Sequence, residues 1–442
     1  MPYEATQSAL RVNEVTSLNL QSADKTQLQQ WQQALSDEYR AIKAKNLDLD
    51  LTRGKPSAEQ LSLSDKLDGI LDGNYKGEDG VDVRNYGGLD GILGARKLGA
   101  AMTGAPVENM LAAGNSSLTL MHQAMTIAYH WGLDGADSSW SKLDKPTVIC
   151  PVPGYDRHYS VCEHLNINMA TVGMDANGPD MDAVEALIES DSNVIGLWCV
   201  PRFSNPTGVV YSDDVVARIA KLGQKANSAF RVFWDNAYAV HQLSDDAPAL
   251  ANIWQACEKA GTTDSVLQFA STSKITFAGA GVAFLAASDS NLNGFKKALS
   301  FITIGPDKVN QLRHERFFAA EGALQEHMKK HADIIQPRFA CVLSHLEKAF
   351  GDNNLGRWES AQGGYFISFD TLPGLAKQVV GLAADAGVKL TPAGATFPYG
   401  QDPKDENIRI APTVPSVEQV DEAMKVFVVC VKLASVLQAL NA

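Results

Sequence analysis

The amino-acid sequence predicts an α/β protein in which a mostly parallel sheet carries helices on both faces. Its 442 residues are 45% hydrophobic, which is enough to build a large core and two lobes. From about residue 107, short runs rich in β-branched and aromatic residues alternate with amphipathic helical segments, as in a parallel sheet covered on both sides. Polar residues directly follow several of these runs, and such sheets bind ligands at the carboxyl ends of their strands.

The larger lobe is expected to span residues 61–305. Its strand candidates, in chain order, are MLAAG, TVICPVP, NINMATVG, NVIGLWCVP, FRVFWD, SVLQFAS and GVAFLAAS. Helical segments lie between several of them, including MDAVEALIES and SDDVVARIAKLGQKAN. The second of these opens with a Ser–Asp pair, which is typical of a helix start.

A smaller α/β lobe is expected over residues 306–442, because the composition changes after about Gly305. Its strand candidates are GRWESAQGGYFISFD and NIRIAPTVP, and its helix candidates include LPGLAKQVVGLAADAG and SVEQVDEAMKVFVVCVKLASVLQAL. Residues 1–60 are expected to join this lobe. They contain a polar helix over about residues 22–45, followed by the extended stretch LDLDLTRGKPS.

The composition also limits the classes of partner. The net charge of −13 argues against nucleic acid as the main partner, since nucleic-acid-binding proteins usually present a basic face. The first residues, MPYEATQSALRVNEV, lack the features of a signal peptide, and no window reaches the roughly 18 apolar residues of a membrane span. The six cysteines are scattered without a CxxC motif, so they are expected to be reduced core thiols with no metal site. A cytoplasmic protein is expected.

Lys274 is the one charged residue in the run QFASTSKITFAGAGVAFLAAS. Lysine is almost never fully buried without a partner. This lysine is therefore a snorkelling side chain, a member of a salt bridge, or a nucleophilic amine whose pKa is lowered by its surroundings. Ser271 and Ser273 stand beside it and could offer hydroxyls to a phosphate.

Two further features follow predicted strands. Asp235 ends the run FRVFWD, and Tyr238 comes three residues later. This acid could cap a helix or form a salt bridge, or it could pair with a protonated ring nitrogen. Asn205 lies in PRFSNPTGVVYS, which is a strong turn signal and also presents an amide at the ligand-binding edge of the sheet.

A third and a fourth feature follow other strands. Gly114, Asn115 and Ser116 lead from the run MLAAG into a helix, where free N–H groups suit either ordinary capping or a bound phosphate. Tyr155, in PVPGYDRHYSV, could stack on a planar ligand or merely fill a groove. Taken together, an amine, an acid and a phosphate cradle suit pyridoxal phosphate, which bonds to lysine and needs an acidic partner for its ring nitrogen.

With the motifs NPTG, D-x-x-Y and S-x-S-K in this order, the chain resembles the fold-type-I pyridoxal-phosphate-dependent aminotransferases, from LDLTRGKPS to ENIRIAPTVPS. It looks closest to the class Ic aspartate aminotransferases, which are related to the aminotransferase-like domain of MocR regulators. The resemblance implies a large domain with a mostly parallel seven-stranded sheet between helices, and a smaller α/β domain. It also implies a homodimer with active sites at the subunit interface.

The resemblance assigns catalytic and cofactor-binding roles. Lys274 would be the Schiff-base lysine and proton shuttle, and Asp235 would hold the ring nitrogen protonated. Tyr238 and Asn205 would hydrogen-bond the phenolic oxygen of the ring, and Tyr155 would stack on its face. The residues implied around the phosphate are Gly114, Asn115, Ser116, Ser271, Ser273 and, from the neighbouring subunit, Tyr86.

The resemblance also names substrate-binding residues. Arg409, in NIRIAP, would grip the α-carboxylate with its planar guanidinium. Gly54, in TRGKPS, and Asn205 would also face the substrate. One position departs from the family: many relatives have a phosphate-clamping arginine about eight residues after the lysine, where this chain has Val282.

The expected reaction is a ping-pong transamination, with aspartate and 2-oxoglutarate as the expected substrates on the strength of the subgroup. A dicarboxylic substrate needs a second cation, for which the candidates are Arg53, Arg84, Arg202 and Arg313. A β-lyase or decarboxylase would share every cofactor residue. A non-catalytic effector-binding module of the MocR type is less favoured, because only about 45 residues with little basic clustering precede LDLDLTRGKPS.

Overall fold

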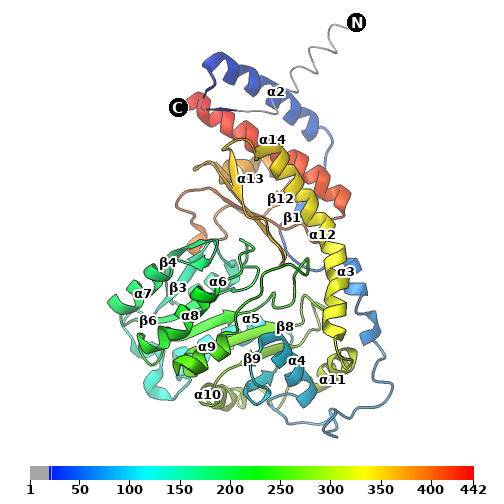
Figure 1. Cartoon of the computed structure of the whole chain (residues 1–442), viewed down its shortest axis with the longest axis vertical. Coiled ribbons are helices and arrows are strands. Elements are labelled where there is room, and N and C mark those ends of the chain that lie inside the picture. The colour runs from blue at the N-terminus through cyan, green and yellow to red at the C-terminus, as the bar shows by residue number, and fades with distance from the viewer. Residues whose placement is uncertain (1–18, 21) are drawn as a thin grey trace. The chain divides into compact units, whose positions relative to one another are not determined.

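The computed structural model describes residues 19, 20 and 22–442, and it divides into two compact units (Figure 1). The large unit contains residues 58–333 with 362–364. The described residues of the small unit are 19, 20 and 22–57, together with 334–361 and 365–442. The residues before 19 and residue 21, including the whole of the MPYEATQSALRVNEV segment, lie outside the described part of the chain.

Within the described residues, the large unit is built on one eight-stranded sheet, in the order β2-β9-β8-β7-β6-β3-β4-β5. Strands β4, β3, β6, β7 and β8 are parallel to one another, whereas β9 runs antiparallel to both of its neighbours. The seven expected strands are all present, and β5 adds a two-residue eighth strand. The strands are β2 (Met110–Ala112), β3 (Thr147–Val152), β4 (Asn168–Asp175), β5 (Gly178–Pro179), β6 (Val194–Cys199), β7 (Arg231–Asp235), β8 (Val266–Ser271) and β9 (Ala283–Ala286).

Helices cover both faces of this sheet, as the alternating pattern predicts. Helices α5, α6 and α10 pack on one face, and α7, α8 and α9 share the core of the other. The Ser–Asp start is confirmed, since the Ser212 hydroxyl caps α8 by accepting from the Val215 N–H. The helices of the large unit are α3 (Ala58–Ser62), α4 (Leu93–Thr103), α5 (Ser117–His130), α6 (Asp156–His164), α7 (Met181–Ser190), α8 (Asp213–Lys221), α9 (Ile253–Ala260), α10 (Asp289–Leu299), α11 (Lys308–Phe317) and the first residues of α12 (Ala323–Phe350).

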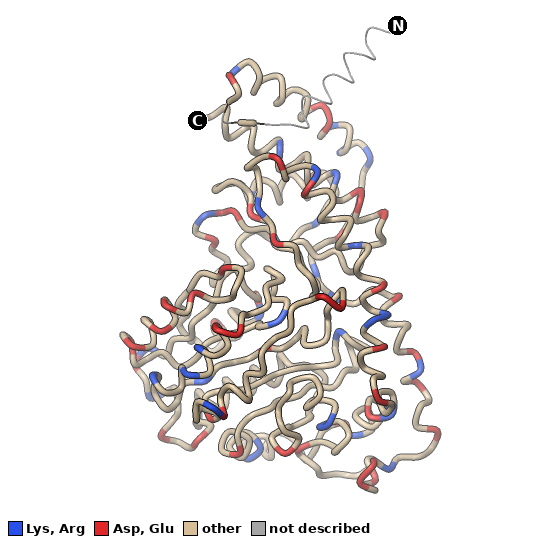
Figure 2. The backbone as a smooth tube through the Cα atoms, viewed as in Figure 1, with Lys and Arg blue, Asp and Glu red and all other residues tan. Residues whose placement is uncertain are grey.

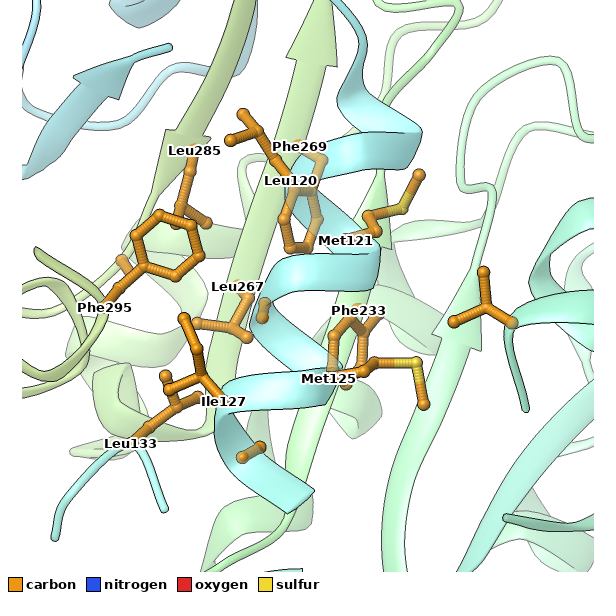
Figure 3. Packing of buried hydrophobic residues seen from close by; sticks show 14 of the residues in the cluster. Leu120, Met121, Met125, Ile127, Leu133, Phe233, Leu267, Phe269, Leu285 and Phe295 are labelled. Atoms are coloured by element: carbon orange, nitrogen blue, oxygen red, sulfur yellow. The ribbon is translucent and has the colours of Figure 1, made fainter. Parts of the chain in front are cut away.

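The core beneath α5 is apolar and aromatic (Figure 3). Phe233 and Phe269 come from neighbouring strands, and their rings stack with centroids 6.0 Å apart. The adjacent residues Val232 and Trp234 point into the core of the opposite face, as the two-residue period of a strand requires. Because both faces of β7 are buried, the strand reads as a nearly continuous apolar run that ends at the acidic residue Asp235.

Residues 306–333 pack with the large unit, whereas the sequence analysis places the boundary after residue 305. The reason lies in α11. The Gln311 amide accepts from the Ile92 N–H and donates to the Ala112 carbonyl, so it ties α11 to α4 and β2. Lys308 is buried in the same unit and donates to the Asn85 carbonyl at 2.8 Å. Composition alone does not reveal such long-range bonds.

The small unit contains two small sheets among its described residues. In one, β1 (Leu49–Leu51) pairs in parallel with β12 (Val388–Leu390). In the other, β11 (Ile367–Thr371) lies between β10 (Gly356–Trp358) and β13 (Asn407–Ile410), antiparallel to both. Its helices are α2 (Lys25–Lys43), α13 (Ala376–Asp385), α14 (Val417–Asn441) and the remainder of α12.

Helix α14 is long and apolar enough, by length and composition, to cross a membrane, although the sequence analysis expects no such span. In the structure, 67% of its most apolar window is buried. It packs against α2 and α13, and the Gln438 amide donates to the Pro373 carbonyl. A buried core helix of a folded unit passes the same test, so α14 by itself is weak support for a membrane span.

Acidic and basic residues are interspersed along the described chain (Figure 2). Several of them pair between neighbouring helices. Arg218 on α8 meets Asp182 and Glu185 on α7, and Lys225 meets Glu185 and Glu189. Such exposed pairs contribute little individually, so the core packing carries most of the stability of the large unit.

Replacing Phe295 on α10 by alanine tests this packing. Phe295 is buried in the cluster beneath α5, and its loss should lower the free energy of unfolding by about 3–5 kcal/mol. Denaturant titration followed by circular dichroism measures the change. The matched control is Val81→Ala at an exposed position, which should stay within about 0.5 kcal/mol of the parent chain. Equal effects of the two changes would contradict the assigned core.

Candidate active site

Lys274 lies in the turn that follows β8. Thr272 closes this turn: its N–H donates to the Val282 carbonyl, and its hydroxyl accepts from the Val282 N–H, both at 2.9 Å. The Val282 side chain is 1% exposed and packs in an apolar cluster that includes Ile275 and Phe284. This position therefore supplies packing to the core and no cation to a ligand.

The amine of Lys274 lies in a desolvated environment. Burial lowers the pKa of the amine below its usual value, and the nearby Asp235 carboxylate opposes this shift. The Lys274 Nζ atom lies 5.0 Å from the centre of the Tyr238 ring. The structure thus brings together the three residues predicted to be catalytic. A lysine amine with a lowered pKa is available in its neutral, nucleophilic form closer to neutral pH.

Asp235 ends β7 and is buried. Its Oδ2 atom lies 2.9 Å from Nε2 of His158, whose ring stacks on Trp198 with centroids 4.1 Å apart. Its Oδ1 atom is buried and has no hydrogen-bond partner among the described residues. A buried carboxylate oxygen without a partner is costly, and it fits a ligand that brings its own N–H group, such as a protonated pyridine nitrogen.

His158 is not among the site residues predicted from the sequence. It lies in the first turn of α6, three residues after Tyr155, in the run PGYDRHYSV. The spacing from Tyr155 was an available signal, because residues three apart in a helix lie on one face. The rings of Tyr155 and His158 meet edge to face at 5.0 Å. His158 thus links the residue predicted to stack on the cofactor ring with the predicted acid.

A pocket at the carboxyl end of the sheet brings two more predicted residues together. Tyr155 and Asn205 both line it, next to His158 and Trp198. Asn205 is buried in the turn after β6, where the Ser204 N–H donates to the Val209 carbonyl and the Gly208 N–H donates to the Ser204 carbonyl. The NPTG motif therefore forms a closed turn, and its asparagine lies at the expected edge of the sheet.

The residues predicted around the phosphate come from two adjoining loops. The Ser273 hydroxyl donates to the Asn115 carbonyl at 2.9 Å, and the Asn115 amide donates to the Gly279 carbonyl at 3.1 Å. Gly114 adopts a left-handed φ of 65°, which lets the chain turn from β2 into α5. Ser116 is the N-cap residue of α5, but its side chain makes no capping bond. Ser271 is buried at the end of β8 and pairs with Ala283 on β9.

Tyr86 is the predicted phosphate ligand that stands apart from these residues. Its side chain is 84% exposed, in a segment held by Lys308 through the Asn85 and Gly87 carbonyls. An exposed aromatic residue on a fixed segment is consistent with a role outside its own subunit.

The two substrate-binding residues predicted in the small unit share one aromatic ring. The guanidinium of Arg409 lies 4.8 Å from the centre of the Phe366 ring, and Arg409 Nε donates to the Thr391 hydroxyl at 3.3 Å. Gly54 packs against the same ring, because a Cβ there would come within 2.4 Å of Phe366. A glycine is required at this close approach. Phe366 is not among the residues predicted from the sequence, since one buried phenylalanine directly before a strand gives no distinct signal.

The four arginines considered for a second carboxylate differ in setting. Arg84 is exposed and pairs with Asp82, and Arg53 is exposed in the small unit. Arg313 is half-buried on α11. Arg202 donates to the Ala239 carbonyl, directly after Tyr238, and burial lowers the pKa of its guanidinium. Arg202 is therefore the candidate that is hydrogen-bonded to the segment that carries Tyr238.

One group of potential metal ligands occurs among the described residues, in the small unit. It consists of Cys341 and His345 on α12 and Asp421 on α14, with ligand atoms within 4.8 Å of one another. The Asp421 carboxylate is already engaged by His345 at 2.8 Å and by the Lys425 ammonium at 2.7 Å. We assign no metal to this group.

Comparison with known proteins gives concordant matches. The family described as aspartate amino-transferase matches residues 23–441. An aspartate aminotransferase of Corynebacterium glutamicum is 43% identical over 422 residues, covering 95% of this chain and 97% of its own. The crystal structure of an aspartate transaminase from the same species superposes with a TM-score of 0.92 at 43% identity, covering 96% of this chain and 100% of that one.

A more distant structure shows the same fold. An α-aminoadipate aminotransferase of Thermus thermophilus, solved with N-(5'-phosphopyridoxyl)-L-leucine, superposes with a TM-score of 0.71 at 19% identity. It covers 92% of this chain and 97% of its own. The likeness extends over both units of the chain.

The electrostatics of the site predict acid sensitivity. Burial and the positive charge of Lys274 lower the pKa of His241 from 6.5 to about 3. The unfolded chain therefore binds more protons than the folded one as pH falls below 6.5, so stability falls with it. The thermal unfolding midpoint should decrease from about pH 7.5 to about pH 5. The decrease should be smaller in His241→Gln, and an equal decrease in both proteins would contradict the assignment.

Proposed function

Because the chain belongs to the aspartate aminotransferase family and is an aminotransferase, we propose that it transfers the amino group of L-aspartate to 2-oxoglutarate with pyridoxal phosphate bound in the large unit. The observation that carries the cofactor assignment is the buried Oδ1 atom of Asp235, which has no partner among the described residues and lies near an amine of lowered pKa. The choice of substrates rests on the relative that is 43% identical and named for aspartate.

The residues that would hold the cofactor come from the ends of several strands. When bound, pyridoxal phosphate supplies an electron sink that draws electron density from the reacting carbon of the amino acid. Asp235 would hold a proton at the ring nitrogen, since His158 already orients its other oxygen. Tyr238 and Asn205 would donate to the phenolic oxygen, and Tyr155 would lie against the ring. The proposed phosphate ligands are Gly114, Asn115, Ser116, Ser271 and Ser273.

Lys274 would both attach the cofactor and move a proton. Burial favours its neutral amine, which can accept a proton at Nζ from the α-carbon of the substrate and return it to a neighbouring carbon. The Asp235 carboxylate favours the charged form and so opposes part of the lowering of the Lys274 pKa by burial. Proton transfer is most effective when the pKa of the group lies near the working pH.

In the small unit, Arg409 would bind the α-carboxylate of the substrate. Its guanidinium is buried against Phe366, and the fork of N–H groups matches a carboxylate. Gly54 would bring its backbone close to the substrate, since the Phe366 ring leaves no room for a side chain there. Asn205, in the large unit, is also proposed as a substrate-binding residue.

We further propose a cytoplasmic homodimer in which Tyr86 reaches the neighbouring subunit. Tyr86 and Phe301 are each 84% exposed, and Ile302 and Ile304 are also exposed. Gly305 approaches the Gly87 backbone so closely that a Cβ would lie 2.5 Å from its carbonyl oxygen, which joins the two segments. A contiguous exposed apolar surface of this kind suits a second copy of the chain. The six thiols are unpaired, as expected in a reducing compartment.

The reaction is tested by mixing the purified protein with a panel of amino acids and following the cofactor absorbance and the oxo-acid products. L-Aspartate should yield oxaloacetate, and 2-oxoglutarate should then be converted to glutamate. Lys274→Ala should retain the cofactor non-covalently and lose about 1,000-fold or more in kcat, because it lacks the base and the covalent link.

Lys297→Ala, at an exposed lysine of α10, serves as the control and should leave kcat unchanged within about 2-fold. Release of pyruvate or carbon dioxide in place of oxaloacetate would identify a lyase or a decarboxylase. Near-normal turnover in Lys274→Ala would contradict the role of Lys274.

Sedimentation equilibrium tests the dimer. The parent chain should sediment at twice the mass of one chain, and Phe301→Asp should shift it towards the monomer, because a charge would be buried in the interface. Trp131→Asp, at an exposed aromatic residue outside this surface, should keep the dimer. A monomeric parent chain, or an unchanged mass in Phe301→Asp, would exclude this surface as the interface.

A further inference from the structure

Two imidazole rings converge on the carbonyl of Ile275, the residue that follows Lys274. The Nε2 atoms of His327 and His331, both on α12, lie 2.7 and 2.9 Å from the Ile275 carbonyl oxygen. The two Nε2 atoms are 3.1 Å apart, and both side chains are buried in the large unit. A carbonyl oxygen has two lone pairs, so it can accept from both rings at once.

The protonation of His331 follows from its second contact. The Gln60 amide nitrogen lies 3.0 Å from Nδ1 of His331. An amide N–H donates, so Nδ1 is the acceptor and the neutral ring carries its proton on Nε2, which faces the Ile275 oxygen. His327 needs the same tautomer, because its Nε2 atom faces that same oxygen at the shorter distance.

The surroundings keep both rings neutral. Burial and the neighbouring His327 lower the pKa of His331 to about 4. Burial and the positive charge of Lys330 lower the pKa of His327, whose ring also packs edge-on against Phe317 and Phe318. The hydrogen bond to the Ile275 carbonyl raises the pKa of each ring, but it does not offset the lowering of the pKa by burial.

Two more histidines hold the same turn. The His241 Nε2 atom lies 3.4 Å from the Lys274 carbonyl oxygen, and the His314 Nε2 atom lies 2.9 Å from the Thr276 hydroxyl. Four of the nine histidines of the chain thus contact residues 274–276. One donor would be enough to satisfy one buried carbonyl, whereas these four contacts fix two successive peptide carbonyls and a side chain directly after the lysine.

We propose that His327 and His331, oriented by Gln60, are positioning residues that hold the Lys274 amine beside Asp235 and Tyr238. The two N–H bonds to the Ile275 carbonyl hold the Ile275–Thr276 peptide, and rotation of that peptide would shift Ile275 and the backbone of Lys274 that is bonded to it. The preceding Lys274–Ile275 peptide is contacted by His241 through the Lys274 carbonyl. The proposal rests on the proposed function of Lys274. Misplacement of a reacting group by about 1 Å can reduce a rate by about 100-fold.

The test compares His327→Leu and His331→Leu with His327→Gln and His331→Gln. Glutamine can place an N–H donor near the position of Nε2, whereas leucine removes it. The leucine variants should lose about 10–100-fold in kcat with KM for aspartate within about 3-fold, because the reacting amine moves and the substrate contacts stay. The pH midpoint of the cofactor absorbance should also shift, and the glutamine variants should return both readouts towards those of the parent.

The matched control is Thr262→Val, which removes a buried side-chain donor from another backbone carbonyl of the large unit, that of Ala220. It should be destabilised and keep its kcat and its absorbance midpoint. Where a leucine variant does not fold, Gln60→Met takes its place, and it should reduce kcat by about 3–10-fold by releasing the tautomer of His331.

Folded leucine or Gln60→Met variants with the kcat and the absorbance midpoint of the parent would overturn the positioning role. A loss of kcat in Thr262→Val equal to that in the leucine variants would also overturn it. If the parent chain does not transaminate, the proposed function fails, and the absorbance midpoint still reports whether the histidines position Lys274.

Discussion

The site depends on the burial of an amine and a carboxylate at the carboxyl ends of neighbouring parallel strands. Asp235 pairs in register with Phe269, so the end of β7 lies beside the last residues of β8. Lys274 follows three residues after β8 ends. Removing either charge from water is costly, and the two shifts are opposed: burial favours the neutral amine and the carboxylate favours the charged one. The sheet register sets this balance, and the surrounding loops preserve it.

In the large unit, neutral N–H donors satisfy the polar groups close to Lys274. A charged lysine or arginine beside Lys274 would lower the pKa of the amine further and repel it. Imidazole rings with lowered pKa values supply N–H groups without adding positive charge. His158 plays the complementary part at Asp235, where it engages one carboxylate oxygen and leaves the other for a ligand. His241, His327 and His331 thus serve through their hydrogen-bonding geometry, because burial lowers the pKa of each ring.

The sequence predicts the strands of the large unit and the grouping of Lys274, Asp235 and Tyr238, because apolar runs ending in polar residues mark the ligand edge of a parallel sheet. It does not predict β5 and β12, whose two and three residues are too short to show a period. The boundary of the large unit depends on the bonds of Gln311, which join residues far apart in the chain. His327 and His331 are four residues apart on a helix, and their spacing alone does not distinguish a packed pair from a pair that meets a distant carbonyl.

The contact between Phe366 and Arg409 has a consequence for the selectivity of the small unit. A guanidinium that lies against an aromatic ring loses its rotamer freedom when the chain folds, so little conformational entropy remains to be lost when a ligand arrives. The ring occupies a face of the cation and uses none of its N–H bonds, so those bonds keep a planar, directional pattern. Ligands are then distinguished by their shape as well as by their charge: a flat carboxylate matches the fork, and a spherical anion of equal charge does not.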